Sequence, residues 1–130
     1  MRDLPGGPAL LELGRRLLLD ELLPLIPEER RRALHLVATA MAIAAREAMA
    51  GEAPAHDIED RLAGFYGDSR DDGCGERGTA LLRRFAADLR GGAFAASESQ
   101  DRAARAILWR LTIAKLREGN PRFLAANGFR

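Results

Sequence analysis

The balance between helix-forming residues and helix breakers constrains the fold of this chain more than any other feature. Alanine and leucine dominate, β-branched residues are scarce, and no stretch alternates apolar and polar residues for long. This pattern favours helices over strands. The 13 glycines and 6 prolines then divide the chain into about five helical segments. We therefore expect an all-α fold, a single-domain bundle of about five helices over residues 1–130, since no repeat or linker marks a second domain.

The breakers set the expected limits of each helix. The predicted helices cover residues 8–23, 27–50, 55–66, 79–90 and 97–119. The last opens with Ser97-x-x-Gln100, a capping box, and ends near Gly119 before Asn120-Pro121. The segment 67–78 between the third and fourth helices is rich in Gly and Asp and is expected to be a loop.

Charge and cysteine content exclude several classes of protein. Twenty basic and nineteen acidic residues leave a formal charge of +1, so the positive field of a nucleic-acid-binding protein is missing. The single cysteine, Cys74, cannot form an internal disulfide. We see no apolar run close to the roughly 20 residues that span a bilayer and no signal peptide. These features predict a cytoplasmic globular protein that binds neither nucleic acid nor membrane.

Three motifs suggest chemistry, and each has a simpler explanation. Residues 73–78 spell G-x-G-x-x-G, but acidic residues rather than a strand precede them, so a surface loop is favoured over a dinucleotide site. Cys74 has no histidine near it in the sequence. His56, Asp57 and Asp60 fit a helix start better than a metal site. We expect no catalytic residue, no metal and no cofactor, and an enzyme is the least favoured class.

Polar residues on the second and fifth helices are the candidates for ligand binding. Arg46 belongs to a polar strip of the second helix, which either lines a pocket or is the solvent edge of the helix, the edge being favoured. If a pocket lies between the two helices, it would use Arg46, Glu47, Lys115 and Asn120. Charge-assisted hydrogen bonds would then hold an acyl-CoA or another organic anion.

Surplus apolar surface points instead to a protein partner. The second helix is apolar on two sides, which is typical of a helix in the middle of a bundle or under a partner. The fifth helix also carries two apolar stripes. If the first faces the bundle, the second, which consists of Trp109, Ile113 and Leu116, needs a cover. Another helix or a second copy of the chain could supply it, and a homodimer is favoured.

Several stretches resemble a small bacterial family of uncharacterised helical domains. They are residues 17–27, residues 37–47, the sequence Leu-Arg-Gly-Gly at 89–92, and the ending at 115–124. The resemblance covers nearly the whole chain, although Thr39 stands where the family pattern has Asn. Members of that family occur beside, or fused to, kinases similar to aminoglycoside phosphotransferases, often near acyl-CoA dehydrogenases.

Two hypotheses of function follow. The resemblance implies an accessory role in acyl-CoA or hydroxy-acid catabolism and assigns no catalytic residue. Together with the surplus apolar surface, it favours a non-enzymatic interaction domain, expected to be a homodimer, that partners a phosphotransferase-like kinase or an acyl-CoA dehydrogenase. The alternative is a small-ligand-binding module for an acyl-CoA or a similar anion.

Overall fold

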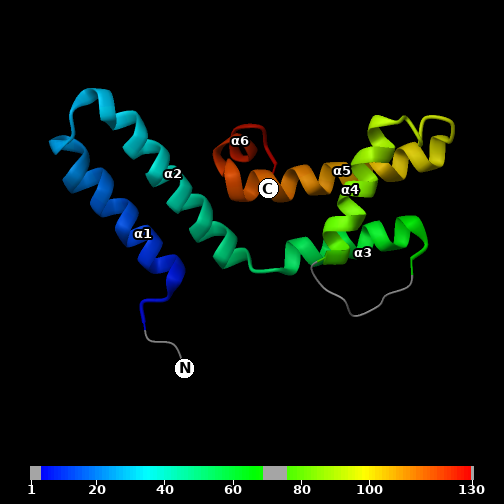
Figure 1. Cartoon of the computed structure of the whole chain (residues 1–130), viewed down its shortest axis with the longest axis horizontal. Coiled ribbons are helices and arrows are strands. Elements are labelled where there is room, and N and C mark those ends of the chain that lie inside the picture. The colour runs from blue at the N-terminus through cyan, green and yellow to red at the C-terminus, as the bar shows by residue number, and fades with distance from the viewer. Residues whose placement is uncertain (1–3, 69–75, 130) are drawn as a thin grey trace. The chain divides into compact units, whose positions relative to one another are not determined.

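The computed structural model describes residues 4–68 and 76–129 of the 130-residue chain. Over these residues it contains six α-helices and no strand (Figure 1), which confirms the all-α prediction. The helices are α1 (Gly7–Leu17), α2 (Glu28–Ala50), α3 (Ala53–Tyr66), α4 (Glu76–Arg90), α5 (Glu98–Gly119) and α6 (Pro121–Ala126).

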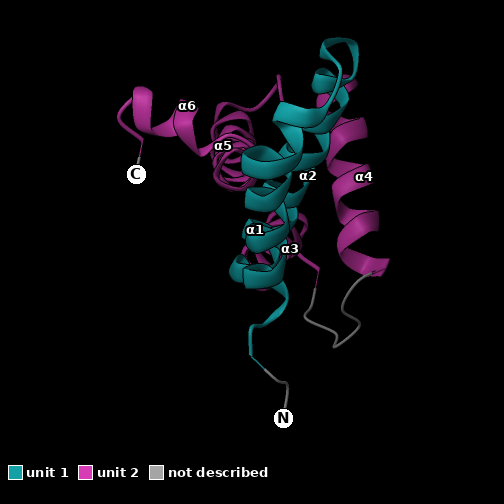
Figure 2. Cartoon of the chain, turned by 90° about the vertical axis from the view of Figure 1, so that its left-hand side faces the viewer, with its two compact units in different colours: residues 1–51 teal, residues 52–130 magenta. Residues whose placement is uncertain are grey.

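The helices group into two compact units. Unit 1 is Met1–Gly51 and contains α1 and α2, and unit 2 is Glu52–Arg130 and contains α3 to α6 (Figure 2). That residues 1–130 make a single bundle stays a prediction.

Unit 1 is a helical hairpin in which α1 packs against α2. A π-helical turn (Leu18–Leu22) and a 3₁₀ turn (Leu23–Leu25) connect the two helices. Ala38 and Ala45, which are 3% and 6% exposed, form the buried part of α2. Opposite them, Gly14 of α1 leaves room for Met41, because a Cβ atom at residue 14 would lie 2.8 Å from the Met41 Cε. Small residues thus let the helices approach closely.

The other side of α1 is a row of exposed leucines. Leu10, Leu13 and Leu17 are 51%, 55% and 48% exposed, at helical spacing on one face. Leu11 and Leu18, on the side of Gly14, are only half-buried. Unit 1 therefore has two leucine faces on one helix, and α2 covers one of them.

Unit 2 has the larger core. Its buried residues come from α3, α4, α5 and the turn after α4: Ile58, Leu62, Ala63, Leu81, Phe85, Phe94, Ala104 and Ile107. Leu62 is completely inaccessible to solvent. The rings of Phe65 and Phe94 meet edge to face with their centroids 5.1 Å apart, and Phe85 stacks on Phe94 at 6.0 Å. The aromatic cluster holds α3, α4 and the turn before α5 together.

The helix ends follow most of the sequence signals. The Ser97 hydroxyl accepts a hydrogen bond from the backbone N–H of Gln100 at 3.4 Å, which confirms the predicted cap of α5. The helix α4 begins at Glu76, three residues before the predicted start. The helix α6 was not predicted, because Asn120-Pro121 reads as a stop. In fact the Asn120 Oδ1 accepts from the Phe123 N–H at 3.2 Å, and Pro121 occupies the first helical position, so the same pair also starts a helix.

Within the described residues, α2 is the one helix with the length and composition to cross a membrane. The expectation that no segment comes close to this length is therefore wrong. A single helix of this kind is weak evidence, because the buried core helix of a soluble protein and a signal sequence meet the same criterion. Only 11% of the qualifying stretch of α2 is buried, although α2 packs against α1.

Candidate functional site

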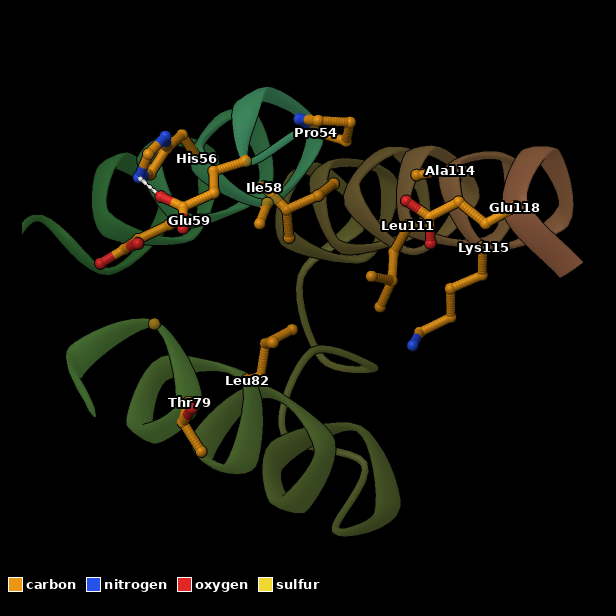
Figure 3. A pocket seen from close by; sticks show the side chains of 13 residues that line it. Pro54, His56, Ile58, Glu59, Thr79, Leu82, Leu111, Ala114, Lys115 and Glu118 are labelled. Carbon is orange, nitrogen blue, oxygen red and sulfur yellow. Dashed lines mark ion pairs between the residues drawn. The ribbon is translucent and has the colours of Figure 1, made fainter. Parts of the chain in front are cut away.

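A groove between α3, α4 and α5 is the first candidate site in unit 2. It encloses about 410 Å³, a volume in the range of small-molecule pockets. Leu82 of α4 and Leu111 of α5 point into the space between the helices (Figure 3), and Ile58 and Ala114 complete the apolar wall. Glu52, Pro54, Ala55, His56, Glu59, Gly78, Thr79, Lys115 and Glu118 make up the remainder of the lining.

The charged groups of the groove gather at its two ends. Lys115 and Glu118 lie at one end, and His56 and Glu59 lie at the other (Figure 3). The His56 Nε2 is 3.9 Å from a carboxylate oxygen of Glu52. The Glu59 carboxylate lies close to Gly78 in the first turn of α4. A Cβ atom at residue 78 would be 3.0 Å from the Glu59 Oε2. The positive end of the α4 dipole favours a carboxylate there.

Of the four residues predicted to bind a ligand, only Lys115 lines this groove. Arg46 and Glu47 are on α2 in unit 1, whereas Lys115 and Asn120 are in unit 2. The Asn120 side chain accepts the capping hydrogen bond of α6, so its oxygen already has a structural role. Arg46 is half-buried. The hydrogen bond from Arg15 is the main cause of the lowered pKa of Glu12, and the charges of Arg15, Arg16 and, least of the three, Arg46 lower it further.

A cleft beside Trp109 is the second candidate site. It encloses about 540 Å³ and is lined by Pro54, Asp57, Ile58, Trp109, Arg110, Ile113, Ala114, Arg117, Gly128 and Phe129. Trp109 is 53% exposed, and its ring meets that of Phe129 edge to face at 5.3 Å. Ile113 and Leu116, the other members of the predicted stripe, are half-buried. The chain itself thus covers the stripe only in part.

Arginines surround one wall of this cleft. The Arg61 Nε donates to both carboxylate oxygens of Asp57, at 3.0 and 3.1 Å, and an Arg110 nitrogen lies 3.7 Å from the same carboxylate. The hydrogen bond from Arg61 is the main cause of the lowered pKa of Asp57, and the charges of Arg61 and then Arg110 lower it further. Asp57 therefore stays ionised and orients the Arg110 guanidinium beside Trp109.

A third polar cluster links α3 to α4. The Tyr66 hydroxyl donates to the Asp88 carboxylate at 2.6 Å, and the Arg84 guanidinium lies 4.0 Å above the Tyr66 ring. Burial, together with the hydrogen bond to Asp88, raises the pKa of Tyr66 to about 12. A phenol that holds its proton this firmly suits a structural role.

The remaining sequence motifs give no further site. Cys74 and the other residues of the first half of the G-x-G-x-x-G segment lie outside the described residues, and the second half belongs to α4. Within the part of the chain that is described, no three His, Cys, Asp or Glu side chains are grouped to hold a metal ion. His35 and His56 belong to different units.

The fold and these two surfaces define an all-α protein with a groove and a partly covered aromatic cleft. Residues 24–123 match the profile of DUF6285, a domain of unknown function, and the chain belongs to that family. The matched segment draws on both units. Comparison with curated proteins gives no match. Comparison with solved structures gives none either.

Proposed function

We propose that this chain is a non-enzymatic interaction domain that binds a partner enzyme through the Trp109 cleft. The observation that carries the proposal is the half-exposed tryptophan at a 540 Å³ cleft, with Phe129 and Ile113 beside it. Tryptophan and arginine dominate the energetic centres of protein interfaces, because both combine a large contact area with a polar group. A cleft beside such a side chain fits an apolar anchor residue of a partner.

The chemistry of the cleft and the family resemblance both bear on the partner. Arg110 and Arg117 line the cleft together with the single carboxylate of Asp57, which favours a partner with acidic residues around its anchor. The resemblance described above suggests which enzymes to try: a kinase similar to aminoglycoside phosphotransferases, or an acyl-CoA dehydrogenase. The domain would serve as an accessory to one of them.

The fluorescence of Trp109 provides the test, because this is the one tryptophan in the chain. The domain is titrated with each candidate enzyme, and its emission is recorded. A tryptophan analogue incorporated at residue 109 separates this emission from that of the enzyme's own tryptophans. Burial of the half-exposed indole is expected to shift the emission to the blue. Trp109→Ser is expected to weaken binding by at least about tenfold, the loss typical of an interface centre.

Leu108→Ser is the matched control, since Leu108 is a neighbouring residue of α5 that is 42% exposed and does not line the cleft. Its affinity for the partner should equal that of the wild type. Absence of binding to either enzyme at about 100 µM would count against the proposal, because functional interfaces bind well below that concentration.

The groove favours a second candidate function, binding of a small organic anion such as an acyl-CoA. Lys115 has no ion-pair or hydrogen-bond partner among the described residues, and an apolar wall lies next to it. A carboxylate or phosphate on Lys115 could place an apolar chain along Leu111 and Leu82. The carboxylate of Glu59 disfavours an anionic group at the opposite end, and at the Lys115 end the carboxylate of Glu118 lies beside the ammonium group.

Thermal-shift measurements with acyl-CoA esters and short-chain carboxylates test this second function. Ligand at about a hundred times its dissociation constant should stabilise the fold by roughly 2.7 kcal/mol. Lys115→Ala should remove most of the shift, whereas Arg90→Ala, on an exposed residue of α4 outside the groove, should not. An unchanged midpoint with every compound rejects an anion-binding groove.

A further inference from the structure

The exposed leucine row of unit 1 is a surface separate from the Trp109 cleft. It begins with Leu10, Leu13 and Leu17 on α1 and continues through Leu22 and Leu25, which are 39% and 78% exposed. The spacing widens to five residues between Leu17 and Leu22, where the helix makes its π turn. Because a π turn holds more residues than an α-helical turn, the wider spacing keeps Leu22 near the same face.

The row is symmetric along the chain. Leu10 and Leu25 are equidistant from the midpoint between residues 17 and 18, and so are Leu13 and Leu22. In a second copy that runs antiparallel about that midpoint, Leu13 would lie level with Leu22 of the π turn and Leu10 level with Leu25 of the 3₁₀ turn, and the Leu17 of each copy would lie next to the centre. Antiparallel pairing about a two-fold axis is the arrangement that a symmetric homodimer requires.

The charges beside the row have the same symmetry. Arg16 and Asp20 are both exposed. Within unit 1 the charge of Arg16 acts on Glu12 and that of Asp20 acts on Arg15, but among the described residues neither forms an ion pair within 4 Å. In the antiparallel arrangement Arg16 lies opposite residue 19 of the other copy, one position from its Asp20. One position along a helix is about 1.5 Å, which side chains of this length bridge easily. Two copies would thus form the Arg16–Asp20 pair twice.

We infer that the leucine row of unit 1 is a homodimer interface, on which a second copy of this chain lies antiparallel and pairs its Asp20 with Arg16. The apolar row supplies the buried surface, as in two-stranded helical interfaces. The flanking charges set the direction, because a parallel copy would place Arg16 beside Arg16 and Asp20 beside Asp20. The inference does not depend on the proposed partner enzyme, since that enzyme binds a different surface.

Sedimentation equilibrium of the full chain over a wide concentration range tests the interface. The wild type is expected to sediment at twice the 14.2 kDa chain mass. Arg16→Asp and Asp20→Arg each create two like-charge contacts, and each should raise the dimer dissociation constant by about tenfold. The double variant R16D/D20R restores opposite charges and should dimerise within a few-fold of the wild type.

Mixing the two single variants makes the test more specific. One copy then carries two acids and the other two bases at these positions, so the mixture should form heterodimers more tightly than either variant dimerises alone. Leu13→Asp should give a monomer, and its circular dichroism shows whether the hairpin is retained. The charge variants keep the test valid if Leu13→Asp unfolds, because Arg16 and Asp20 are exposed.

Three results would overturn the inference. A wild type that remains monomeric at about 100 µM would show that the leucine row has another cover or none. A dimer dissociation constant that neither Arg16→Asp nor Asp20→Arg changes would exclude the antiparallel register. A dimer that Trp109→Ser abolishes while Leu13→Asp leaves it intact would place the interface on the cleft of unit 2.

Discussion

Tyr66 shows how one half-buried polar side chain ties two helices together. Its phenol belongs to α3 and its acceptor Asp88 to α4, and the 2.6 Å hydrogen bond is among the shortest side-chain contacts in unit 2. Arg84, also on α4, lies over the face of the ring. A hydrogen bond to a charged acceptor contributes more than one between neutral groups, so this contact is a main polar link between α3 and α4.

We predict that Tyr66 titrates near pH 12 in the folded protein and near 10.0 in the unfolded protein. Because the folded state holds the proton more tightly, the stabilisation is present in full below pH 10 and disappears as the pH rises towards 12. Tyr66 is the one tyrosine in the chain, so the tyrosinate absorbance reports it alone. Tyr66→Phe should lower the free energy of unfolding by about 1–2 kcal/mol at neutral pH. The variant should also lack the part of the stability loss at high pH that comes from ionisation of Tyr66. An ordinary tyrosine titration in the folded state would contradict the prediction.

The sequence identifies part of the core at the level of single residues. The spacing of the fourth predicted helix indicates that Leu81, Leu82, Phe85 and Leu89 are buried. Leu81 and Phe85 are buried, but Leu82 and Leu89 are 38% and 36% exposed. Phe94 is buried at 8% exposure although it lies in the turn between two helices, where periodicity gives no signal. Only the tertiary contact with Phe65 and Phe85 explains its position.

At the scale of the helix pair, Gly14 of α1 lies under the terminal methyl group of Met41 on α2. We predict that Gly14→Leu destabilises unit 1 by about 1–3 kcal/mol, the usual cost of adding volume to a packed contact. The reason is that the space over Gly14 is already filled by the Met41 side chain. Chemical denaturation followed by far-ultraviolet circular dichroism measures the effect.

Gly64→Leu is the control for this prediction. Gly64 lies within α3, and a Cβ atom there would meet nothing within 4 Å. The better helix propensity of leucine should stabilise that variant by about 0.5–1 kcal/mol. If both glycine substitutions behave alike, the close approach at Gly14 has no energetic importance.

The first and last residues of the helices are the feature of the fold that the sequence predicts best. Proline and glycine positions predicted α2 and α3 to within one or two residues, because these breakers act locally. The π turn at Leu18–Leu22 and the helix α6 were not predicted. The first depends on how α1 packs, and the second depends on whether Asn120 turns its side chain to the following backbone, which the sequence alone does not determine.

For the whole molecule, the two units differ in how much apolar surface they bury. Unit 2 has a core of eight buried residues around Leu62, whereas the buried residues of unit 1 are Ala38 and Ala45 within its described part. An isolated helical hairpin with so little buried surface is marginal in water. The stability of unit 1 must therefore depend on what it contacts.

We predict that residues 52–130, expressed alone, fold and unfold cooperatively on heating. Residues 1–51 alone should show little helix at about 1 µM and more as the concentration rises, since a self-associating hairpin is stabilised by mass action. Circular dichroism as a function of temperature and concentration measures both. A fragment 52–130 without a cooperative transition would show that its core is insufficient by itself.

The division of the chain into two units also limits what the sequence alone predicts about the ligand site. The predicted ligand site requires α2 and α5 to face one another in a single bundle. The structure describes Arg46 and Glu47 in unit 1 and Lys115 in unit 2. The groove could not be foreseen, because it depends on the packing of α3 and α4 around α5. The pattern alone indicates that Trp109 belongs to a second apolar stripe of α5, and the side chain is 53% exposed. That this stripe is an interface stays a prediction.

The boundary at Gly51 has an optical consequence. Every phenylalanine, tyrosine and tryptophan of the chain lies after it, so residues 1–51 contain no aromatic chromophore. Intrinsic fluorescence and near-ultraviolet circular dichroism therefore report the unfolding of unit 2 and do not report that of the hairpin in unit 1. Melting curves from Trp109 emission and from backbone ellipticity will coincide only if the two units unfold together. A difference between the two midpoints shows that the units unfold separately.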